Sequence, residues 1–363
     1  MTQFISFYLP QFHPIAENNK WYGEGFTEWT NVVKAKPLFH GHYQPHIPAN
    51  LGFYDLRLPE SRRAQANLAQ KYGISAFCYW TYWFGAGKQL LEMPIFEVQK
   101  DKSITLPFCI AWANHSWEKK LWDKKGNKEV IMEQKYLGEA DYKAFFYRML
   151  PLFKDSRYYR IDGKMFVCIY DCLANQDVKI FIDTWRNLAK QEDLGEFFFC
   201  GRDSASRNKD EILSLGVDAI YNDNIYNIHH NLSLISKMWL YFKRKFLHLP
   251  TVFKYKEASN YMLTDDAKDE NVIPVIAPNW DHSPRSGRKS ILLHDCQPEY
   301  FYNLVKKVID VVEKKKKNVV LIKAWNEWGE GNHMEPDLKY GKGYLKALKA
   351  AIENSEFKNE RYS

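Results

Sequence analysis

Short apolar runs alternate with longer amphipathic segments along most of the chain. In the amphipathic segments the apolar residues recur every three or four positions, which is typical of helices that cover a core with one face. The apolar runs are nearly continuous, as in parallel strands that are covered on both sides. We predict eight such strands, at Phe4–Leu9, Ile74–Trp80, Leu106–Ala111, Met165–Tyr170, Phe197–Cys200, Asp218–Tyr221, Val272–Ile276 and Val319–Ala324.

Helical segments are predicted between these strands. One ends at Gly73, a residue type that commonly terminates helices, and a last one covers about 342–352. Eight strands interleaved with helices predict an α/β protein with a (β/α)8 TIM barrel. The alternative is an open, doubly wound sheet, but no glycine-rich phosphate loop follows any strand, which counts against its nucleotide-binding versions. The strongest helical stripe comprises Phe301, Leu304, Val305, Val308, Ile309 and Val312.

Two long segments, 10–59 and 226–270, interrupt the alternation. In a barrel they would be the loops after the first and sixth strands, on the face where such enzymes bind their ligands. The 363 residues suit one large barrel with insertions of this kind, and we find neither a linker nor a second core. We therefore predict a single domain over residues 1–363.

Aromatic residues make up 16% of the chain, with 12 Trp and 23 Tyr. Most of them are expected in the core, but aromatic rings also line ligand sites, where a ring face stacks on the C–H groups of a sugar. The net charge of +7 is a mild basic excess, which suits an anionic partner or surface without requiring one. Nucleic-acid binding has no other support, and we predict none.

The cysteines and the N-terminus bear on the compartment. Six cysteines lack the spacing of metal or redox motifs, and Cys78, Cys109, Cys168 and Cys200 lie in predicted strands, so we expect reduced, buried thiols. The first residues lack the pattern of a secretory signal peptide, and no apolar run reaches the length of a membrane span. These features predict a cytoplasmic protein.

Polar and aromatic side chains recur together where the predicted strands end. In barrels of this class the chemistry lies at that end of the strands. Ordinary capping of strands explains one or two Asp or Asn residues, but it explains less well the repeated pairing of rings with polar groups. We predict a ligand site made by Tyr8, His13, Tyr79, Trp80, Tyr82, Trp83, Trp112, Asn114, His115, Tyr170, Asp171, Arg202, Asp223, Trp280 and Arg285, with Trp325, Asn326 and Trp328 after the last strand.

The stretch AWNEWGEG follows the last strand and places Glu327 and Glu330 between tryptophans. Asp, Asn and Arg side chains bind sugar hydroxyls, and glycosidic cleavage needs two carboxyl groups at the scissile bond. An environment of tryptophan rings that excludes water should raise the pKa of one carboxyl group and suit that group to donate a proton. Gly329 and Gly331 would allow a tight turn that points both side chains into one cavity. The alternative is two exposed glutamates on a loop, paired with Lys or Arg.

Two further groups of residues accompany this pair. Glu335 is either a partner of the glutamate pair or the acid at the start of the following helix. Glu28, Trp29 and Asn31 lie in the first long insertion and are expected to shape the rim of the site or to hold the insertion over the barrel.

The chain resembles the WbsX-like family, which is related to glycoside hydrolase family 99. The resemblance runs from Ile5 to about Tyr344 and implies a (β/α)8 barrel. The motifs that carry it are FYLPQFHP…GFTEWTNV…PLFHGHYQPH, KYGISAFCYWTYWF, PFCIAWANHSW and AWNEWGEGNHMEPDLKYG. Motifs of this length and specificity make chance similarity a poor explanation.

The resemblance also implies a chemistry, because family 99 enzymes are retaining endo-acting mannosidases and mannanases. In that family one glutamate deprotonates the sugar 2-hydroxyl, which attacks C1 to form a 1,2-anhydro sugar, while the other glutamate is first acid and then base. The family motif WNEWxEG maps onto Glu327 as the base and onto Glu330 as the acid/base. No protein nucleophile is needed, because the 2-hydroxyl is already held beside C1. The 2-hydroxyl must be trans to the leaving group, as in α-mannosides and α-rhamnosides.

These observations predict a hydrolase, without a cofactor, that acts on a bacterial polysaccharide or on an intermediate of its assembly. A glycosyltransferase of O-antigen or capsule biosynthesis is the first alternative, because WbsX-like proteins are often named so. The stretch DAIYNDN at 218–224 lacks the second aspartate of a metal–diphosphate motif, which counts against the metal-dependent kind. The second alternative is a barrel that binds glycans without catalysis.

Two remaining segments raise the question of other partners. Residues 232–256 mix Trp, Phe and Leu with Lys and Arg. They suit either an amphipathic element on an anionic membrane or an insertion helix that packs on the barrel, and the packed helix is the simpler interpretation. His13, His40, His42 and His46 match no zinc-binding spacing, and we predict no metal site.

Overall fold

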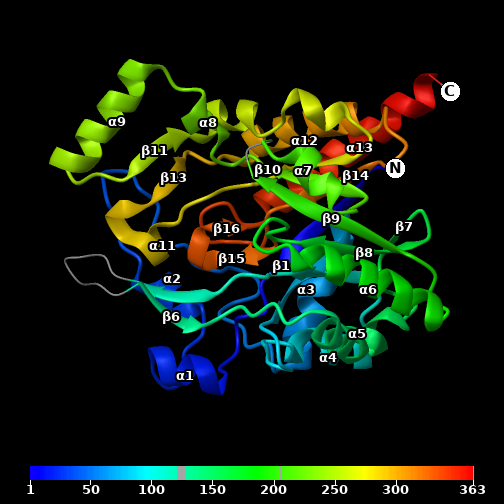
Figure 1. Ribbon diagram of the computed structural model, residues 1–363. Coiled ribbons are helices and arrows are strands. Elements are labelled where there is room, and N and C mark those ends of the chain that lie inside the picture. Colours follow the sequence, from blue (N-terminus) through cyan, green and yellow to red (C-terminus); the bar gives the residue numbers. More distant parts are fainter. Residues whose placement is uncertain (121–127, 205–206, 363) are drawn as a thin grey trace.

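The computed structural model describes residues 1–120, 128–204 and 207–362. Within them, eight parallel strands form a closed barrel in which each strand lies beside the next one along the chain (Figure 1). The predicted (β/α)8 barrel is thus confirmed, and the open sheet is excluded. The strands are β1 (Gln3–Tyr8), β2 (Ile74–Trp83), β4 (Phe108–Trp112), β8 (Lys164–Ile169), β9 (Phe197–Ser204), β10 (Ala219–Asp223), β12 (Val272–Ile276) and β14 (Val319–Ile322).

The barrel closes because β1 has a partner on each side. Ile5 lies opposite Leu321 of β14 on one side and opposite Ala76 of β2 on the other. Four strands end later than predicted, β2 at Trp83, β4 at Trp112, β9 at Ser204 and β10 at Asp223. Side chains therefore alternate between barrel interior and exterior over stretches that the sequence had assigned to loops.

Helices cover the outside of the barrel as predicted. The helix before β14 buries all six residues of the stripe that its sequence shows. At the end of the helix before β2, Gly73 has φ of 93°, and a Cβ there would lie 2.6 Å from Cδ1 of Ile352. These helices are α3 (Pro59–Lys71), α4 (Met93–Lys100), α5 (Glu139–Phe153), α6 (Asp177–Gln191), α7 (Lys209–Ser214), α12 (Pro298–Val312) and α13 (Gly343–Tyr362).

Much of the aromatic content lies between these helices and the strands. The Trp185 ring of α6 packs 4.5 Å from Phe181, 5.0 Å from Phe145 and 5.4 Å from Phe197, measured between ring centroids. Its Nε1 donates to the carbonyl of Tyr142 over 3.0 Å, so the indole is satisfied inside the core. These rings therefore serve packing. The cysteines are free thiols, and all but Cys296 are buried, as expected for Cys78, Cys109, Cys168 and Cys200.

The two predicted insertions lie where the strands end. Residues 10–59 contain α1 (Ala16–Tyr22) and α2 (Trp29–Lys34), and residues 226–270 contain α8 (Asn227–His230), α9 (Leu234–Phe246), β11 (Thr251–Lys254) and α10 (Tyr255–Ala258). Two further insertions escaped the sequence pattern. They are the hairpin of β5 (Trp117–Lys120) and β6 (Lys128–Met132), and the segment of α11 (Ser283–Ser286) and β13 (Ile291–His294), which pairs with β11.

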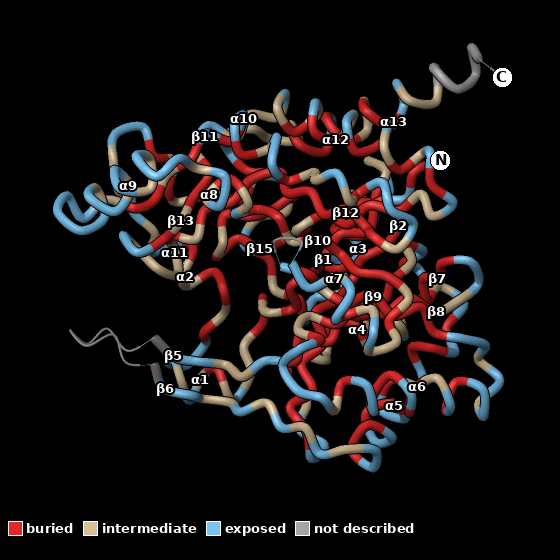
Figure 2. The backbone as a smooth tube through the Cα atoms, turned by 45° about the horizontal axis from the view of Figure 1, so that its top comes forward, coloured by how far each residue is buried: buried red, intermediate tan, exposed pale blue. Residues whose placement is uncertain are grey.

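Figure 2 shows how burial follows this architecture: the barrel strands are buried, and the insertions carry most of the exposed surface on their side of the molecule. The short strands β3 (Gln89–Leu90) and β7 (Arg160–Ile161) pair antiparallel with β2 and β8, respectively. No helix within the described residues is both long and apolar enough to cross a membrane. The single-domain boundary at 1–363 stays a prediction.

Candidate active site

The chain after β14 turns back on itself and carries the glutamate pair. β15 (Asn326–Glu327) and β16 (Asn332–His333) form a short antiparallel ladder, joined by a 3-10 turn at Trp328–Glu330. Gly331 ends this turn with a left-handed φ of 52°, and a Cβ there would lie 2.7 Å from Cβ of Asp281. Glycine at this position therefore allows the turn that presents Glu330. We call residues 323–335 the glutamate hairpin.

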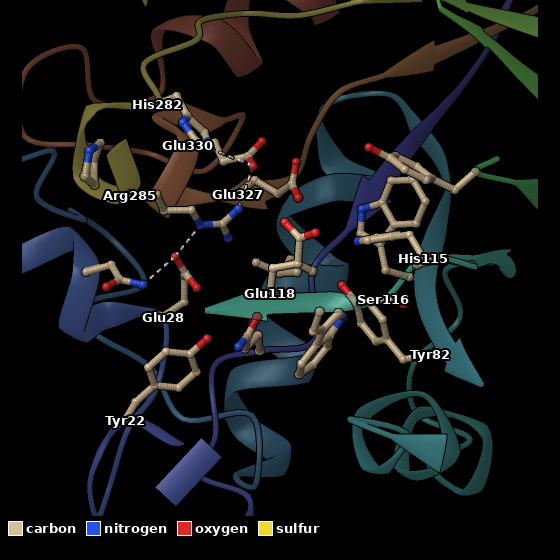
Figure 3. A pocket seen from close by; sticks show the side chains of 18 of the residues that line it. Tyr22, Glu28, Tyr82, His115, Ser116, Glu118, His282, Arg285, Glu327 and Glu330 are labelled. Atoms are coloured by element: carbon tan, nitrogen blue, oxygen red, sulfur yellow. Dashed lines mark hydrogen bonds and ion pairs between the residues drawn. The ribbon is translucent and has the colours of Figure 1, made fainter. Parts of the chain in front are cut away.

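Glu327 and Glu330 line a cavity of about 560 Å³ at the end of the barrel where the strands finish (Figure 3). This volume is typical of small-molecule sites, which span roughly 300–1,000 Å³. Its wall comes from the first insertion, from β2 and β5, and from α11. Aromatic rings supply much of that wall, contributed by Tyr22, Phe26, Trp80, Tyr82, Trp117 and Tyr170.

Arg285 of α11 holds two acids at once. Its Nε donates to Oε1 of Glu28 over 2.9 Å, and its Nη1 donates to Oε1 of Glu330 over 2.5 Å (Figure 3). Nε2 of His282 lies 3.6 Å from the same oxygen of Glu330. A Cβ on Gly329 would overlap the carboxylate of Glu28, whose Cδ would be 2.7 Å away. Gly329 is therefore needed for this close approach, and Gly331 for the turn itself.

The two carboxyl groups differ in their affinity for a proton. Burial, and next the charge of Glu330, raise the pKa of Glu327 to about 8. Burial would also raise the pKa of Glu330, but the positive charges of Arg285, His282 and Lys323 outweigh it and hold that pKa below its ordinary value. The pair therefore keeps one proton near neutral pH, and this environment favours the proton on Glu327.

Lys323, directly after β14, adds a positive charge to the cavity wall. Its Nζ donates to Oδ2 of Asp223 over 2.8 Å, and Nη1 of Arg202 lies 3.7 Å from that oxygen. Burial would lower the pKa of Lys323, but Asp223 and the two glutamates raise it above its ordinary value, so the amine is charged. Cζ of Arg202 lies 3.7 Å from the ring centroid of Tyr170. Asp223 and Arg202 thus act on the cavity through Lys323 and Tyr170.

The structure divides the predicted site residues into two groups. The cavity is lined by Trp80, Tyr82, His115, Tyr170, Arg285, Glu327 and Glu330. The others lie behind or beside it, because a position at a strand end does not fix the side to which the side chain points. This second group consists of Tyr8, His13, Tyr79, Trp83, Trp112, Asn114, Asp171, Arg202, Asp223, Trp280, Trp325, Asn326, Trp328 and Glu335.

Glu335 supports the glutamate hairpin from behind. Its Oε2 accepts from Nε1 of Trp328 over 2.6 Å and from the hydroxyl of Tyr54 over 2.9 Å, and its Oε1 accepts from Nε2 of Gln65 over 2.7 Å. Gln65 in turn accepts from the hydroxyl of Tyr8 over 2.7 Å. Burial raises the pKa of Glu335 to about 7. The residue lies well before α13, so of its two expected roles the structure shows it as a support of the hairpin.

Asn326 ties the glutamate hairpin to the end of the first strand. Its Oδ1 accepts from the backbone N–H of Leu9 over 2.7 Å, and its Nδ2 donates to the Leu9 carbonyl over 3.0 Å. Trp325 is fully buried, with its ring 5.0 Å from that of Phe77. These contacts fix the position of the glutamates and do not face the cavity.

Polar groups from β2 and β4 support a second part of the wall. Nε1 of Trp83 donates to Oδ2 of Asp141 over 2.9 Å, and Nε1 of Trp112 donates to the carbonyl of Trp83 over 3.2 Å. Asn114 makes two hydrogen bonds with the backbone of Asp171, at 2.7 and 2.8 Å. These residues position the ends of neighbouring strands.

The last three predicted residues are also buried outside the cavity. The ring of Tyr79 lies 4.4 Å from that of Tyr8 within the barrel. Burial lowers the pKa of His13 to about 4, so its imidazole is neutral. Nζ of Lys323 lies over Trp280, 4.8 Å from the centroid of its ring.

Several cavity residues were not selected from the sequence. Glu118 of β5 points toward Glu327 in Figure 3, but it belongs to a hairpin that no pattern predicted. Lys323 lies inside the predicted last strand and His282 lies between the predicted residues Trp280 and Arg285, so selecting every polar residue near the strand ends would have found both. Tyr22 lies within the first insertion, where no periodicity indicated which residues face the barrel.

A second polar cluster lies behind the glutamate hairpin. His46, His333 and Asp337, all buried, offer ligand atoms within 4.8 Å of one another and are a group that could hold a metal ion. Nδ1 of His46 lies 3.0 Å from Nε2 of His333, whose own Nδ1 donates to the carbonyl of Glu335 over 2.9 Å. That donation leaves Nε2 of His333 as an acceptor, the form in which imidazole binds zinc. The absence of a metal stays a prediction.

Comparison with known proteins places this geometry in a family. The family model described as Glycosyltransferase WbsX matches residues 4–348. A curated relative from Xanthomonas campestris pv. campestris (strain B100), named uncharacterized protein WxcX, is 37% identical over 355 residues, which are 96% of this chain and 49% of the relative. The chain spans about half the length of the curated relatives it matches.

Solved structures share the barrel. A glycoside hydrolase-like protein has a TM-score of 0.60 at 15% identity, over 96% of this chain and 93% of its own. The GH99 endo-alpha-mannosidase from Bacteroides thetaiotaomicron has a TM-score of 0.59 at 17% identity, over 99% of both chains. Likeness at these identities concerns the fold. The sequence match over nearly the whole chain shows that this protein belongs to the WbsX glycosyltransferase family.

Proposed function

We propose that this chain is a retaining enzyme that cleaves an α-glycosidic bond of mannoside or rhamnoside type, in a bacterial polysaccharide or an intermediate of its assembly. The carboxyl pair Glu327 and Glu330, which shares one proton in a ring-lined cavity, carries the proposal. Acid–base cleavage of a glycoside needs one protonated and one ionised carboxyl at the same pH. The WbsX family and the likeness to a GH99 barrel support a glycan as the substrate.

In the first step the sugar itself supplies the nucleophile. The 2-hydroxyl gives its proton to Glu327, and its oxygen attacks C1 to form a 1,2-anhydro sugar. The bond from C1 to the leaving oxygen breaks, and that oxygen takes the proton of Glu330. Holding the 2-hydroxyl beside C1 makes the attack intramolecular, so the enzyme needs to position only an acid and a base.

This assignment requires the shared proton to move when the sugar binds. Without the sugar, the surroundings of the pair favour the proton on Glu327. A 2-hydroxyl that donates a hydrogen bond to Glu327 stabilises its carboxylate and lowers its pKa, since hydrogen bonds to the charged form favour that form. The proton then passes to Glu330, opposite the leaving oxygen.

In the second step water replaces the leaving group. A water molecule gives a proton to Glu330 and attacks C1, the bond from C1 to the ring-closing oxygen breaks, and that oxygen recovers its proton from Glu327. Two inversions at C1 give net retention. Arg285, hydrogen-bonded to Glu330, would keep this carboxyl oriented through both steps. The rings of Trp80, Tyr82 and Tyr170 would stack on the sugar faces.

Screening tests the proposal. The purified protein would be incubated with α-mannosides, α-rhamnosides and bacterial surface polysaccharides, with Glu330→Gln as the control. Product release by the native chain, lost in the variant, is the expected result. Turnover that survives unchanged in Glu330→Gln would remove this residue from the mechanism.

A glycosyltransferase is the second candidate, because the family description names that activity. The same carboxyl pair would serve it if a sugar hydroxyl replaced water in the second step. The acid nearest to a metal–diphosphate motif, Asp223, already pairs with Lys323 over 2.8 Å, which argues against a metal-bound nucleotide donor there. Analysis of products formed with and without sugar acceptors separates transfer from hydrolysis.

A further inference from the structure

The insertion after β10 carries a helix whose apolar side faces solvent. α9 has 13 residues, all of them lie within the described chain, and none of them is buried. Figures 1 and 2 show α9 projecting from the barrel and exposed along most of its length. The simpler interpretation of this segment, a helix that packs its apolar face on the barrel, is therefore wrong.

The exposed apolar residues of α9 share one side. At 3.6 residues per turn they fall within a single wide arc, whereas Leu240 lies opposite and is the half-buried residue that packs against the core. Ser233 caps the helix, since its hydroxyl accepts from the backbone N–H of Ser236 over 3.2 Å. The arc contains Leu234 (79% exposed), Ile235 (80%), Met238 (72%), Trp239 (53%), Phe242 (41%) and Phe246 (59%).

The charge on this segment has one sign. The helix carries Lys237, Lys243, Arg244 and Lys245, and the chain has no Asp or Glu from Asn224 to Lys256. Nζ of Lys243 lies 5.2 Å from the ring of Trp239, and Nζ of Lys245 lies 5.3 Å from that of Tyr241. Long basic side chains at the border of an apolar face can keep their stems on it while their charges reach outward.

We propose that α9 is a membrane-binding element that lays its apolar arc into the surface of a bilayer with anionic headgroups. Interfacial helices combine a wide apolar face that contains Trp and Phe with basic residues on the polar face and no acidic ones. In α9 the basic residues Lys237, Lys243 and Arg244 lie outside the apolar arc, and only Lys245 falls within it. The centres of protein interfaces are depleted in lysine, whereas flexible amines suit the phosphates of a bilayer surface. The uniform positive charge therefore favours a lipid surface over a protein partner.

The position of α9 relates this surface to the cavity. α9 lies on the same side of the molecule as α2 and α11, the elements beside the cavity that hold Glu28 and Arg285 (Figures 1 and 2). A chain resting on α9 would hold its cavity near the bilayer. If the proposed function holds, the substrate is then a glycan anchored in that membrane. Vesicle binding itself needs no substrate, so it can fail or succeed independently of catalysis.

Sedimentation with vesicles tests the proposal. The full chain is incubated with vesicles of phosphatidylcholine alone or mixed with phosphatidylglycerol, at low and high salt. Ile235→Ser with Trp239→Ser should weaken binding more than tenfold at both salts, because it removes apolar contact. Lys243→Gln with Arg244→Gln should weaken binding to the anionic vesicles about 30-fold at low salt, given roughly fivefold per cation. At high salt this second variant should resemble the native chain.

A matched control comes from the opposite side of the molecule. Tyr147 is 48% exposed on α5, so Tyr147→Ser removes a similarly exposed ring and should bind like the native chain. Absence of native binding to anionic vesicles at low salt overturns the proposal. Equal binding of the α9 variants and Tyr147→Ser overturns it as well. If the α9 variants instead convert a dimer into a monomer in light scattering, without any vesicle binding, a second copy covers this face.

Discussion

The glutamate hairpin and α9 use similar residues in opposite surroundings. Both combine tryptophan with charged side chains on the same side of one barrel. In the hairpin, Trp328 is buried and donates to Glu335 over 2.6 Å, and Glu330 is bonded to Arg285. In α9, Trp239 is 53% exposed and the basic residues have no acid within their own segment. The role of such residues therefore depends on their surroundings. Where the rings are buried and the charges are paired, they shape a cavity; where the rings are exposed and the charges are not paired within the segment, they form a docking surface.

The largest effect that would test this contrast is loss of catalysis at the hairpin. Glu327→Gln and Glu330→Gln should each lower turnover about a thousandfold, within the range for removal of a general acid or base. A substrate with a good aryl leaving group needs little acid help, so it should restore the first step, measured as rapid release of the aryl alcohol, in the Glu330 variant only. Rescue of the Glu327 variant instead would mean that Glu327 is the acid and Glu330 the base. Neither substitution should change vesicle binding.

A smaller effect is expected when the support of the pair is disturbed. Gly329→Ala should displace the Glu28 carboxylate and, through Arg285, misplace Glu330, lowering turnover about ten- to a hundredfold. In a Glu28→Ala background the clash with the carboxylate is gone and only Nε of Arg285, 3.0 Å from the added Cβ, stays close, so Gly329→Ala should then cost less. Equal losses from Gly329→Ala in both backgrounds would show that the Glu28 contact is irrelevant to it.

Stability should change in opposite directions for the two glutamates. The pKa of Glu327 is raised to about 8 from an ordinary value of 4.5, so above pH 4.5 the unfolded chain releases a proton that the folded chain retains. Ionisation thus favours unfolding increasingly up to pH 8, and Glu327→Gln should stabilise the protein there by on the order of a few kcal/mol. At pH 4 the gain should vanish.

The matched variant is Glu330→Gln. The pKa of Glu330 is lowered, so its ionisation supports the folded state above its ordinary pKa, and that support is lost as pH falls. The variant should therefore be less stable than the native chain at pH 8. Thermal unfolding at pH 4 and pH 8 checks both variants, and equal shifts for the two would contradict the unequal sharing of the proton.

The smallest expected effect is at α9. Trp239→Ser should change the free energy of unfolding by less than about 0.5 kcal/mol, because the ring makes no buried contact that folding requires. The same substitution at Trp328 should cost about 3–5 kcal/mol. Denaturant unfolding measures both. A large loss at Trp239 would mean that α9 belongs to the folded core.

The sequence was sufficient for the barrel and for the glutamate pair. Continuous apolar runs report strands covered on both faces, and the motif around Glu327 directly follows such a run. The sequence did not predict which side chains at the strand ends face the cavity. Trp80 lines the cavity and Tyr79 beside it does not, because adjacent strand residues point to opposite faces. The sequence also cannot tell that Arg285 bridges Glu28 and Glu330, since these residues come from α11, from the first insertion and from the hairpin after β14.

The α9 segment shows the other limit. Its amphipathic pattern is plain in the sequence, but a pattern does not say whether the apolar face meets protein or something else. The simpler interpretation assumed protein, and the observed exposure of Ile235 and Met238 overturned it. Cytoplasmic location, absence of a cofactor and absence of nucleic-acid partners stay predictions.

The tie between Asn326 and Leu9 spans 317 positions. During synthesis β1 is made before β14, so β1 lacks one of its two neighbouring strands until the stretch from β14 onward leaves the ribosome. The glutamates also belong to that late stretch, so a chain that stops before β14 lacks both the glutamate pair and the strand that completes the barrel. Closure of the barrel and completion of the cavity therefore depend on the same stretch of residues.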